Sequence, residues 1–292
     1  MVKAIKKKTR VQPADVIIFC IILLLVAVTV VPFMNLLAVS LSSRGAVLRD
    51  RTMLFPREFT LGAYAFILKS PAIYKSFFIT LAITATATAV HLFITVLAGA
   101  ALSQKALPFR RTMMLFVLFT MLFSGGLVPY YLVISQLGLI DTFWVLSIPG
   151  TASAFSIILM KNFIMQIPGA LIDAAEMDGA GPLRVTAGII VPLSLPIIAT
   201  LSLFCAVGKW NDWFTAYIFI KKAKHLLPLQ NVLQNIVINT NTGNIGEGIN
   251  LEDFSENFQK ALIVFALIPI VAVYPFVQRY FVKGIFLGSV KE

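Results

Sequence analysis

Three carboxylates gather in one short polar segment that lies between two apolar stretches: Asp173, Glu176 and Asp178. Carboxylates form strong, charge-assisted hydrogen bonds with basic side chains. A membrane segment has no packing need for such charges, whereas a soluble partner that grips a membrane protein from the water side does need them. The segment therefore predicts a docking element, with a solvated interfacial turn as the alternative.

The same segment carries the signals of a short helix. Pro168 suits its first turn and Gly179 suits its end. A helix of about ten residues is about 15 Å long, which is too short to cross a bilayer. Alanines within it allow a partner to approach the backbone closely. The expected contact residues are Asp173, Ala174, Ala175, Glu176, Asp178 and Gly179.

The composition indicates that the surrounding chain is a membrane protein. Of its 292 residues, 59% are hydrophobic and 13% are charged, against roughly 25% charged residues in soluble domains. The mean hydropathy is +0.90. Six windows reach about the 20 apolar residues that a spanning helix needs. They are residues 16–39, 77–102, 113–134, 143–163, 186–207 and 261–281.

These windows predict an all-α, polytopic membrane protein with six transmembrane helices. The alternative, a soluble core of buried helices, would need polar helix faces that the windows lack. The basic cluster before the first window is also compatible with a signal peptide. Because the apolar run exceeds the roughly 7–15 residues of a signal h-region, we expect it to be retained as the first helix.

The windows hold few groups that could do chemistry. None contains Asp or Glu, and His91 is the only titratable side chain deep in a window. A proton-coupled carrier or an intramembrane hydrolase needs acids or a nucleophile–base pair there. The chain also lacks the Gly-x4-Gly-Lys-Ser/Thr loop of a nucleotide hydrolase. We expect a non-catalytic chain without a cofactor or metal, in which Cys20 and Cys205 serve packing. His91 is expected to be a hydrogen-bonded packing residue, with a proton relay as the alternative.

The basic residues indicate orientation rather than nucleic-acid binding. The net charge is +11, carried mostly at window ends and in loops, as is ordinary for membrane proteins. The two sides carry similar numbers, so the short loops decide. Lys105, Arg110 and Arg111 follow the second window, whereas no basic residue follows the third before the fourth begins. Together with the N-terminal cluster, this places both termini and the Asp173 segment in the cytoplasm.

Glycine and proline interrupt several windows. Non-helical backbone at membrane depth is tolerated only where protein or a water-filled cavity satisfies its polar groups. Broken helices are therefore candidates for the wall of a gated transport path, and ordinary proline kinks are the alternative. The candidates are Gly125, Gly126 and Pro129 in the third window, Pro192 and Pro196 in the fifth, and Pro269 and Pro275 in the sixth.

Aromatic and polar residues near the window ends suit a sugar. Aromatic rings can stack on the apolar faces of sugar rings, and Asn or Asp can bond hydroxyls, a combination common in small-molecule sites. Trp and Tyr also collect at membrane interfaces without touching a substrate, which is the alternative. The candidate path residues are Tyr130, Tyr131, Trp210, Asn211, Asp212 and Trp213.

The polar segment resembles the EAA loop of binding-protein-dependent ABC importer permeases. The residues that carry the resemblance are Asp173-Ala174-Ala175, Asp178-Gly179-Ala180, Ile189, Pro192 and Pro196. Asp173 stands where that family usually has Glu, which leaves the salt-bridge partner open. The resemblance covers most of the chain and implies one permease domain, residues 1–292, with the type I ABC importer permease fold.

Other stretches resemble narrower groups within this family. Residues 207–214 and 227–230 look like sugar importers related to the maltose permeases. Residues 123–131 and 137–142 look like a branch that handles larger or acidic oligosaccharides, alginate among them. Cationic clusters raise the local concentration of anions, and the predicted outer side carries Arg49, Arg51, Lys221, Lys222 and Lys224. Contacts of these cations with lipid headgroups or with a binding protein are the alternatives.

The resemblance implies an assembly in the bacterial inner membrane. The chain would pair with a second, homologous permease and with two ATPase subunits that bind ATP and Mg. An extracytoplasmic solute-binding protein would deliver the oligosaccharide. Residues 168–182 would form the cytoplasmic coupling loop, and residues 239–257 a periplasmic loop before the last helix. A channel or facilitative carrier regulated through its cytoplasmic loop is the alternative function.

Overall fold

The computed structural model describes residues 13–242 and 255–288. These residues form helices, turns and one isolated bridge between Ser42 and Phe59, so the predicted all-α class is confirmed. The chain divides into two compact units, Met1–Ile67 with Thr240–Phe265, and Leu68–Asn239 with Ala266–Glu292. Residues 243–254, the greater part of the predicted outer loop 239–257, lie outside the described residues.

Three described helices are individually long and apolar enough to cross a bilayer. They are α1 (Pro13–Ser40), α4 (Pro71–Ser103) and α15 (Glu256–Gly288). Three more candidate crossings are bent pairs of shorter helices. The pairs are α5 (Arg110–Leu122) with α6 (Leu127–Gln136), α8 (Ala154–Ile164) with α9 (Gly169–Met177), and the stretch Pro182–Leu193 with α12 (Leu195–Trp210). By length and composition, with each pair counted as one crossing, the described part of the chain holds up to six, the number predicted. The predicted fourth window, residues 143–163, ends before α9, the predicted docking helix.

The remaining helical elements are short or lie at unit boundaries. They are α2 (Arg44–Arg49), α3 (Gly62–Lys69), α7 (Phe143–Ser147), α10 (Pro182–Val185), the π-helix η1 (Thr186–Ile190), α11 (Val191–Leu193), α13 (Phe214–Phe219), the 3₁₀ turn η2 (Lys224–Leu226) and α14 (Leu229–Thr242).

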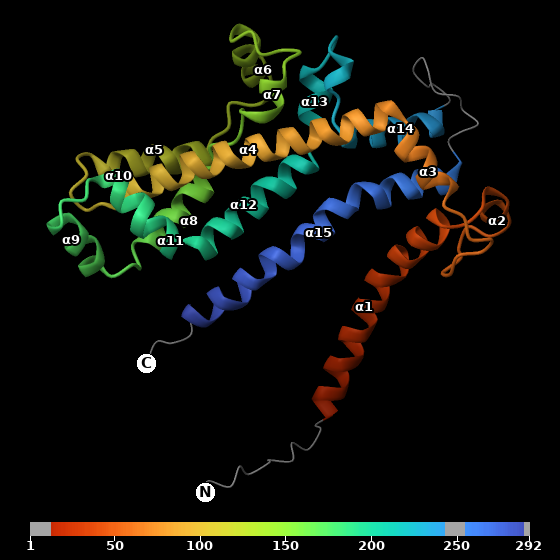
Figure 1. Ribbon diagram of the computed structural model, residues 1–292, viewed down its shortest axis with the longest axis horizontal. Helices are drawn as coiled ribbons and strands as arrows, with labels where there is room; N and C mark the ends of the chain where they lie inside the picture. The colour runs from red at the N-terminus through yellow and green to blue at the C-terminus, as the bar shows by residue number, and fades with distance from the viewer. Residues whose placement is uncertain (1–12, 243–254, 289–292) are drawn as a thin grey trace, which may run out of the picture. The chain divides into compact units, whose positions relative to one another are not determined.

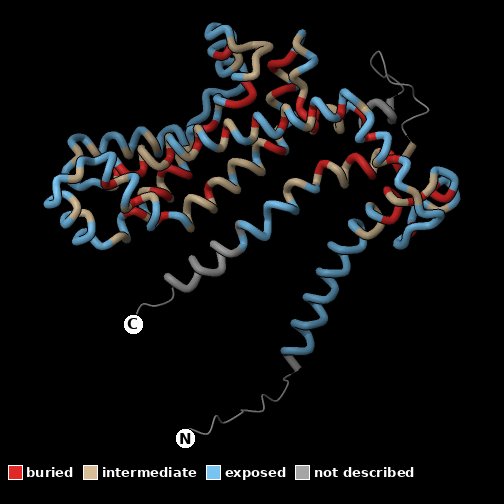
Figure 2. Tube along the Cα trace, viewed as in Figure 1, coloured by how far each residue is buried: buried red, intermediate tan, exposed pale blue. Residues whose placement is uncertain are grey.

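In the first unit, α1 is exposed along most of its length (Figure 2). Its apolar residues face outward on all sides, as expected of a helix whose surroundings are hydrocarbon rather than protein. Only its last turns are buried, where Ala38 and Val39 pack against Val47 and Met53. Asn35 ties this end to the following loop, since its Nδ2 donates to the carbonyl of Met53 at 2.9 Å.

In the second unit, α4 lies beside α8 and α12 (Figure 1). The buried residues of α4 recur at helical spacing along one face, from Ile73 to Leu102. Gly99 lies on this face and faces α8, where an added Cβ would come within 2.8 Å of Met160 Cγ. The small residue therefore allows the two helices to approach closely, as in other membrane helix pairs.

The structure corrects the predicted fourth and fifth windows. The fourth window is not one helix, because the chain breaks between α7 and α8 at Pro149 and Gly150, where Gly150 has φ +77°. Proline removes a backbone donor, and a left-handed glycine ends helical geometry. The fifth helix continues to Trp210 rather than stopping at Val207, which brings Lys209 into its last turn.

Sharp bends lie beside the predicted glycines and prolines of the third and fifth windows. The axes of α5 and α6 differ by 112°, and Gly126 between them has φ +84°. The fifth window bends by 83° at Ser194, which lies between Pro192 and Pro196. The sixth window differs, since α15 continues through Pro269 and Pro275.

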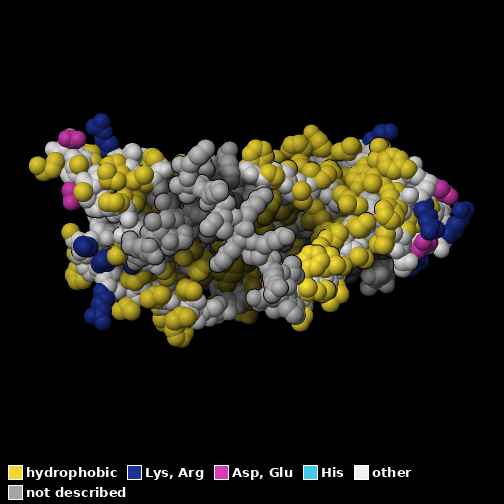
Figure 3. Space-filling view, turned by 90° about the horizontal axis from the view of Figure 1, so that it is seen from below, with side chains coloured by type: hydrophobic (Ala, Val, Ile, Leu, Met, Phe, Trp, Pro, Cys, Tyr) yellow, Lys and Arg dark blue, Asp and Glu magenta, His cyan; other side chains and the backbone are white. Residues whose placement is uncertain are grey.

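Two buried clusters hold the second unit together. One contains Ile83, Ile134, Val145, Leu146, Ala216, Phe219 and Ile220, and the other contains Ala100, Met160, Ile164, Val185, Ile190 and Leu201. Outside these clusters much of the apolar surface remains exposed, and hydrophobic side chains cover much of the face drawn in Figure 3. Such a surface is compatible with a lipid environment, because soluble monomers rarely expose large contiguous apolar patches.

Candidate functional site

The predicted docking helix is present as α9, Gly169–Met177. Pro168 is its N-cap residue, and Asp178 is its C-cap residue. The following turn is closed by hydrogen bonds from the backbone N–H of Gly179 to Glu176 and from Ala180 to Ala175. This is the Schellman arrangement, in which a left-handed residue follows the C-cap. Gly179 has φ +79° and supplies that conformation.

One face of α9 packs on the unit and the other is exposed. Ile172 and Ala175 pack against the cluster that contains Met160 and Ile164. The predicted contact face is therefore divided, since Ala175 points inward. Exposed on α9 and its C-terminal turn are Leu171, Asp173, Ala174, Glu176, Met177, Asp178 and Gly179, with Met177 89% exposed. Carboxylates and apolar side chains thus share the exposed face.

A polar pocket of about 430 Å³ opens within the second unit. It is built from α4, α6, α8, α12, α13 and the connections between them. Its lining residues are His91, Tyr130, Pro149, Gly150, Ser153, Phe155, Ser156, Phe204, Cys205, Gly208, Lys209, Asp212 and Thr215. Two of the six candidate path residues, Tyr130 and Asp212, meet there.

The α7–α8 connection positions the polar side chains of this pocket. Lys209 Nζ donates to the carbonyls of Leu146 and Pro149, each at 3.1 Å. His91 Nδ1 lies 2.6 Å from the carbonyl oxygen of Thr151. The break at Pro149 therefore leaves carbonyl groups that α4 and α12 both use, which satisfies backbone acceptors that a bilayer would leave unpaired.

Asp212 is held by the start of α13. Its carboxylate accepts from the backbone N–H of Thr215 at 3.0 Å and from the Thr215 hydroxyl at 2.6 Å. A second, very small pocket lies on its other side, lined also by Thr80 and Lys209. Asp212 and Lys209 thus give the polar pocket one acidic and one basic group.

The other candidate path residues have structural contacts instead. Trp210 is 4% exposed, and its Nε1 donates to the carbonyl of Ala266 at 3.0 Å. Tyr131 stacks on Phe219 with ring centroids 5.6 Å apart and accepts from Lys221 Nζ at 2.7 Å. Neither residue lines the polar pocket.

Asn211 and Trp213 are the remaining two candidate path residues. Asn211 Nδ2 donates to the carbonyl of Val207 at 2.9 Å, and its Oδ1 accepts from Gln230 Nε2 at 3.3 Å. Trp213 is partly exposed, and its carbonyl accepts from Asn231 Nδ2. Both side chains lie outside the lining of the polar pocket.

Sequence reasoning missed Lys209 and undervalued His91. Lys209 lies beyond the predicted fifth window, residues 186–207, although the helix itself continues to Trp210. His91 makes the expected hydrogen bond, yet its Nε2 has no hydrogen-bond partner among the described residues. A signal was present, since His91 recurs with Thr84, Thr88 and Thr95 at helical spacing in an otherwise apolar window.

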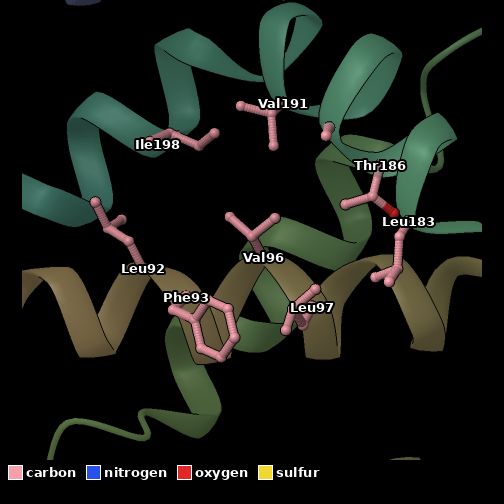
Figure 4. A pocket seen from close by; sticks show the side chains of 9 residues that line it. Leu92, Phe93, Val96, Leu97, Leu183, Thr186, Val191 and Ile198 are labelled. Carbon is pink, nitrogen blue, oxygen red and sulfur yellow. The ribbon is translucent and has the colours of Figure 1, made fainter.

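An apolar pocket of about 450 Å³ provides a contrast. Figure 4 shows Leu92 and Val96 of α4 extending toward the segment that carries Val191 and Ile198. Phe93 and Leu97 of α4 and Leu183 and Thr186 of the opposite segment also line the pocket. Its one hydroxyl, from Thr186, already donates to the carbonyl of Pro182 at 2.8 Å. A polar solute would find no free hydrogen-bond donor among these side chains. A fourth pocket, about 560 Å³, lies at the α5–α6 break beside Gly125, Gly126 and Pro129.

Asp141 fixes the connection between α6 and α7. Its Oδ1 accepts from the backbone N–H groups of Lys221, Lys222 and Ala223, at 2.6, 2.8 and 3.1 Å. The N–H of Ala223, followed by those of Lys222 and Lys221 and by the Lys222 charge, lowers the pKa of the Asp141 carboxyl against the opposing effect of its desolvation.

Ion pairs occupy part of the cationic surface predicted to attract anions. Arg49 pairs with Glu58 at 3.3 Å, and Arg51 pairs with Glu256 at 3.4 Å. Exposed pairs contribute only about 0–1 kcal/mol to stability, but they reduce the charge available to a passing anion. The cations that remain from that set are Lys221, Lys222 and Lys224.

Metal-binding side chains do not cluster in the described part of the chain. No group of three or more His, Cys, Asp or Glu there could hold a metal ion. Both cysteines are free. Cys20 is exposed on α1, and the half-buried Cys205 lines the polar pocket.

Comparison with known proteins identifies the family. Residues 93–287 match the family described as the binding-protein-dependent transport system inner membrane component. The chain is 39% identical over 280 residues to the polygalacturonan/rhamnogalacturonan transport system permease protein YtcP of Bacillus subtilis (strain 168), covering 95% of this chain and 98% of the relative. It is also 39% identical to the protein LplC of the same strain, covering 91% and 90%.

Solved structures agree with this match. A chain of a bacterial ABC transporter involved in the import of the acidic polysaccharide alginate superposes with a TM-score of 0.83 and 30% identity, covering 92% of this chain and 98% of that chain. A chain of the bacterial alginate ABC transporter in complex with an alginate pentasaccharide-bound periplasmic protein has a TM-score of 0.57 and 13% identity. The second likeness supports the shared fold alone.

Proposed function

The chain belongs to the family of inner membrane components of binding-protein-dependent transport systems, and we propose that it imports an acidic oligosaccharide, such as a uronate. Its fold is that of a type I ABC importer permease. In this proposal residues 1–292 form one non-catalytic permease domain. The chain provides a path through the membrane, and partner subunits hydrolyse the ATP.

The observation that carries the assignment to an ATP-driven permease is the exposed face of α9. On a chain built mainly of apolar helices, this short helix presents carboxylates beside Leu171 and Met177. Such a mixed face suits a soluble partner that buries the apolar side chains and pairs the acids. We assign this role to an ATPase subunit, with Asp173, Ala174, Glu176, Asp178 and Gly179 in contact. Ala175 supports the helix from below.

The proposed substrate class has support from the relatives. Polygalacturonan, named for YtcP, and alginate, named for the superposed transporter, are both polymers of uronic acids. A permease that resembles both over more than nine-tenths of its length is expected to meet a similar ligand. Of the predicted path residues, Tyr130 and Asp212 fit best, because both line the polar pocket.

The proposed assembly follows from the family. A second, homologous permease completes the path, and two ATPase subunits bind ATP and Mg on the cytoplasmic side. An extracytoplasmic solute-binding protein delivers the oligosaccharide, with residues 239–257 as its contact loop. Both termini and α9 lie in the cytoplasm of a bacterial cell, and lipid surrounds the apolar helices. The breaks at Gly125, Gly126 and Pro129 and at Pro192 and Pro196 are the proposed moving points of the gate.

Reconstitution of the complete transporter in proteoliposomes tests this function. We expect uptake of labelled trigalacturonate that requires ATP and the binding protein, and a lower rate with neutral maltotriose. The matched control replaces the catalytic base of the partner ATPase, which should abolish uptake. Equal or faster uptake of maltotriose would refute the acidic substrate. Uptake that continues with the inactive ATPase would instead identify a channel or facilitative carrier.

A further inference from the structure

We propose that the polar pocket around His91 binds one pyranose ring of the transported oligosaccharide. The inference rests on the proposed function and adds a binding site within this permease, together with the residues that form it. The site comprises His91, Tyr130, Lys209 and Asp212, with Phe155 and Phe204 as its aromatic walls. Four of these six residues were not among the predicted path residues: His91, Phe155, Phe204 and Lys209.

His91 supplies a buried acceptor. The side chain is 3% exposed and lies 2.6 Å through Nδ1 from the Thr151 carbonyl. A carbonyl oxygen only accepts hydrogen bonds, so Nδ1 carries the hydrogen. In the neutral ring Nε2 is then an acceptor. Nε2 has no partner among the described residues, and an unpaired buried acceptor costs free energy. A ligand hydroxyl that donates to Nε2 would remove this cost.

Lys209 and Asp212 supply the complementary groups. An ammonium group has three donors, and Lys209 Nζ gives two of them to Leu146 and Pro149. One N–H therefore remains for a ligand oxygen. The Asp212 carboxylate, held by Thr215, can accept from hydroxyls. Opposite charges in one pocket cancel, which suits the hydroxyl-rich part of a sugar.

The walls of the pocket match a sugar ring. Tyr130, Phe155 and Phe204 provide aromatic surface for the apolar face of a pyranose, and Tyr130 adds a hydroxyl. The volume of about 430 Å³ falls within the roughly 300–1,000 Å³ of small-molecule sites. The neighbouring apolar pocket is of similar size, but its side chains offer no free hydrogen-bond donor, so the distinction lies in chemistry rather than space.

Two substitutions separate ligand binding from structure. In His91→Asn, the amide nitrogen takes the place of Nδ1 and retains the bond to Thr151, while the acceptor at Nε2 is lost. In Tyr130→Phe, only the hydroxyl is lost. The matched control is Tyr131→Phe, since this neighbouring tyrosine bonds Lys221 and lies outside the pocket lining.

Equilibrium binding of labelled trigalacturonate to the assembled permease–ATPase complex in nanodiscs, without the binding protein, is the test. We expect His91→Asn and Tyr130→Phe each to raise Kd about threefold to tenfold, the effect of one lost hydrogen bond. Tyr131→Phe should leave Kd unchanged. If His91→Asn does not assemble, Tyr130→Phe decides alone.

Absence of binding to the unaltered complex, or equal Kd in the pocket variants and the control, would overturn the pocket assignment. ATP-driven uptake of the same probe by the complete transporter is measured in parallel. If the unaltered complex binds the probe but the complete transporter does not take it up, the proposed import function is contradicted and the pocket assignment is not. The two failures are therefore distinguishable.

Discussion

The Oδ1 atom of Asp141 lies 2.6 Å from the backbone nitrogen of Lys221, a residue 80 positions further along the chain. The same oxygen accepts from Lys222 and Ala223, and the backbone N–H of Asp141 donates to the carbonyl of Phe219 at 3.1 Å. One carboxylate thereby joins the α6–α7 turn to the segment after α13. Both elements border the cluster that contains Phe219 and Val145.

Asp141→Asn should lower the thermal stability of the complex and change its pH dependence. Because bonds from Ala223 and its neighbours lower the folded pKa of Asp141, its contribution is present above the unfolded pKa of about 3.9. That contribution is lost as the pH falls through the lower folded pKa. The unfolding midpoints of the two proteins should therefore draw together as the pH is lowered below about 3.9. A difference between the two midpoints that does not shrink as the pH falls would contradict this role for Asp141.

Gly179→Ala should weaken coupling between sugar and ATP hydrolysis. A Cβ at Gly179 meets nothing within 4 Å, so the cost comes from φ +79° and is about 1–2 kcal/mol. That strain opposes the turn that ends α9. We expect substrate-stimulated ATP hydrolysis to fall several-fold, and Gly179→Asp to reduce it at least as far.

Gly181→Ala provides the matched comparison for coupling. Gly181 has an ordinary φ of −71°, and its added Cβ would also meet open space. Stimulated hydrolysis should stay near that of the unaltered complex. Equal losses at positions 179 and 181, or no loss at either with assembly intact, would contradict the role assigned to the α9 turn.

Gly99→Ala should destabilise the α4–α8 contact. The new Cβ would lie 2.8 Å from Met160 Cγ and 3.2 Å from the backbone nitrogen of Lys161. Overpacking of this kind typically costs about 1–3 kcal/mol. The yield of assembled complex and its unfolding midpoint should both fall. Adding Met160→Ala should restore only part of the lost yield and midpoint, because the contact with the Lys161 backbone remains. Gly188→Ala, whose added Cβ meets open space, is the control and should be tolerated.

Local patterns predicted the helices and the α9 segment well, because apolar runs, Pro168 and Gly179 act within a few residues. The polar pocket could not be predicted in the same way. Its geometry depends on Lys209 reaching carbonyls about 60 residues away, made available by the break after α7. Charge and hydropathy along the chain carry no information about that contact.

The same limit explains Trp210, which aromatic type and position at a window end nominated for the sugar path. Its indole lies buried, with Nε1 bonded to Ala266 and its ring edge-on to Phe77 at 5.8 Å between centroids. Trp210→Phe should therefore lower the unfolding midpoint, because it removes one buried hydrogen bond. Such a bond contributes about 0.5–1.5 kcal/mol to the free energy of unfolding. Trigalacturonate Kd should stay unchanged, in contrast to Tyr130→Phe. A Trp210→Phe complex that unfolds normally but binds the sugar more weakly would return this residue to the path.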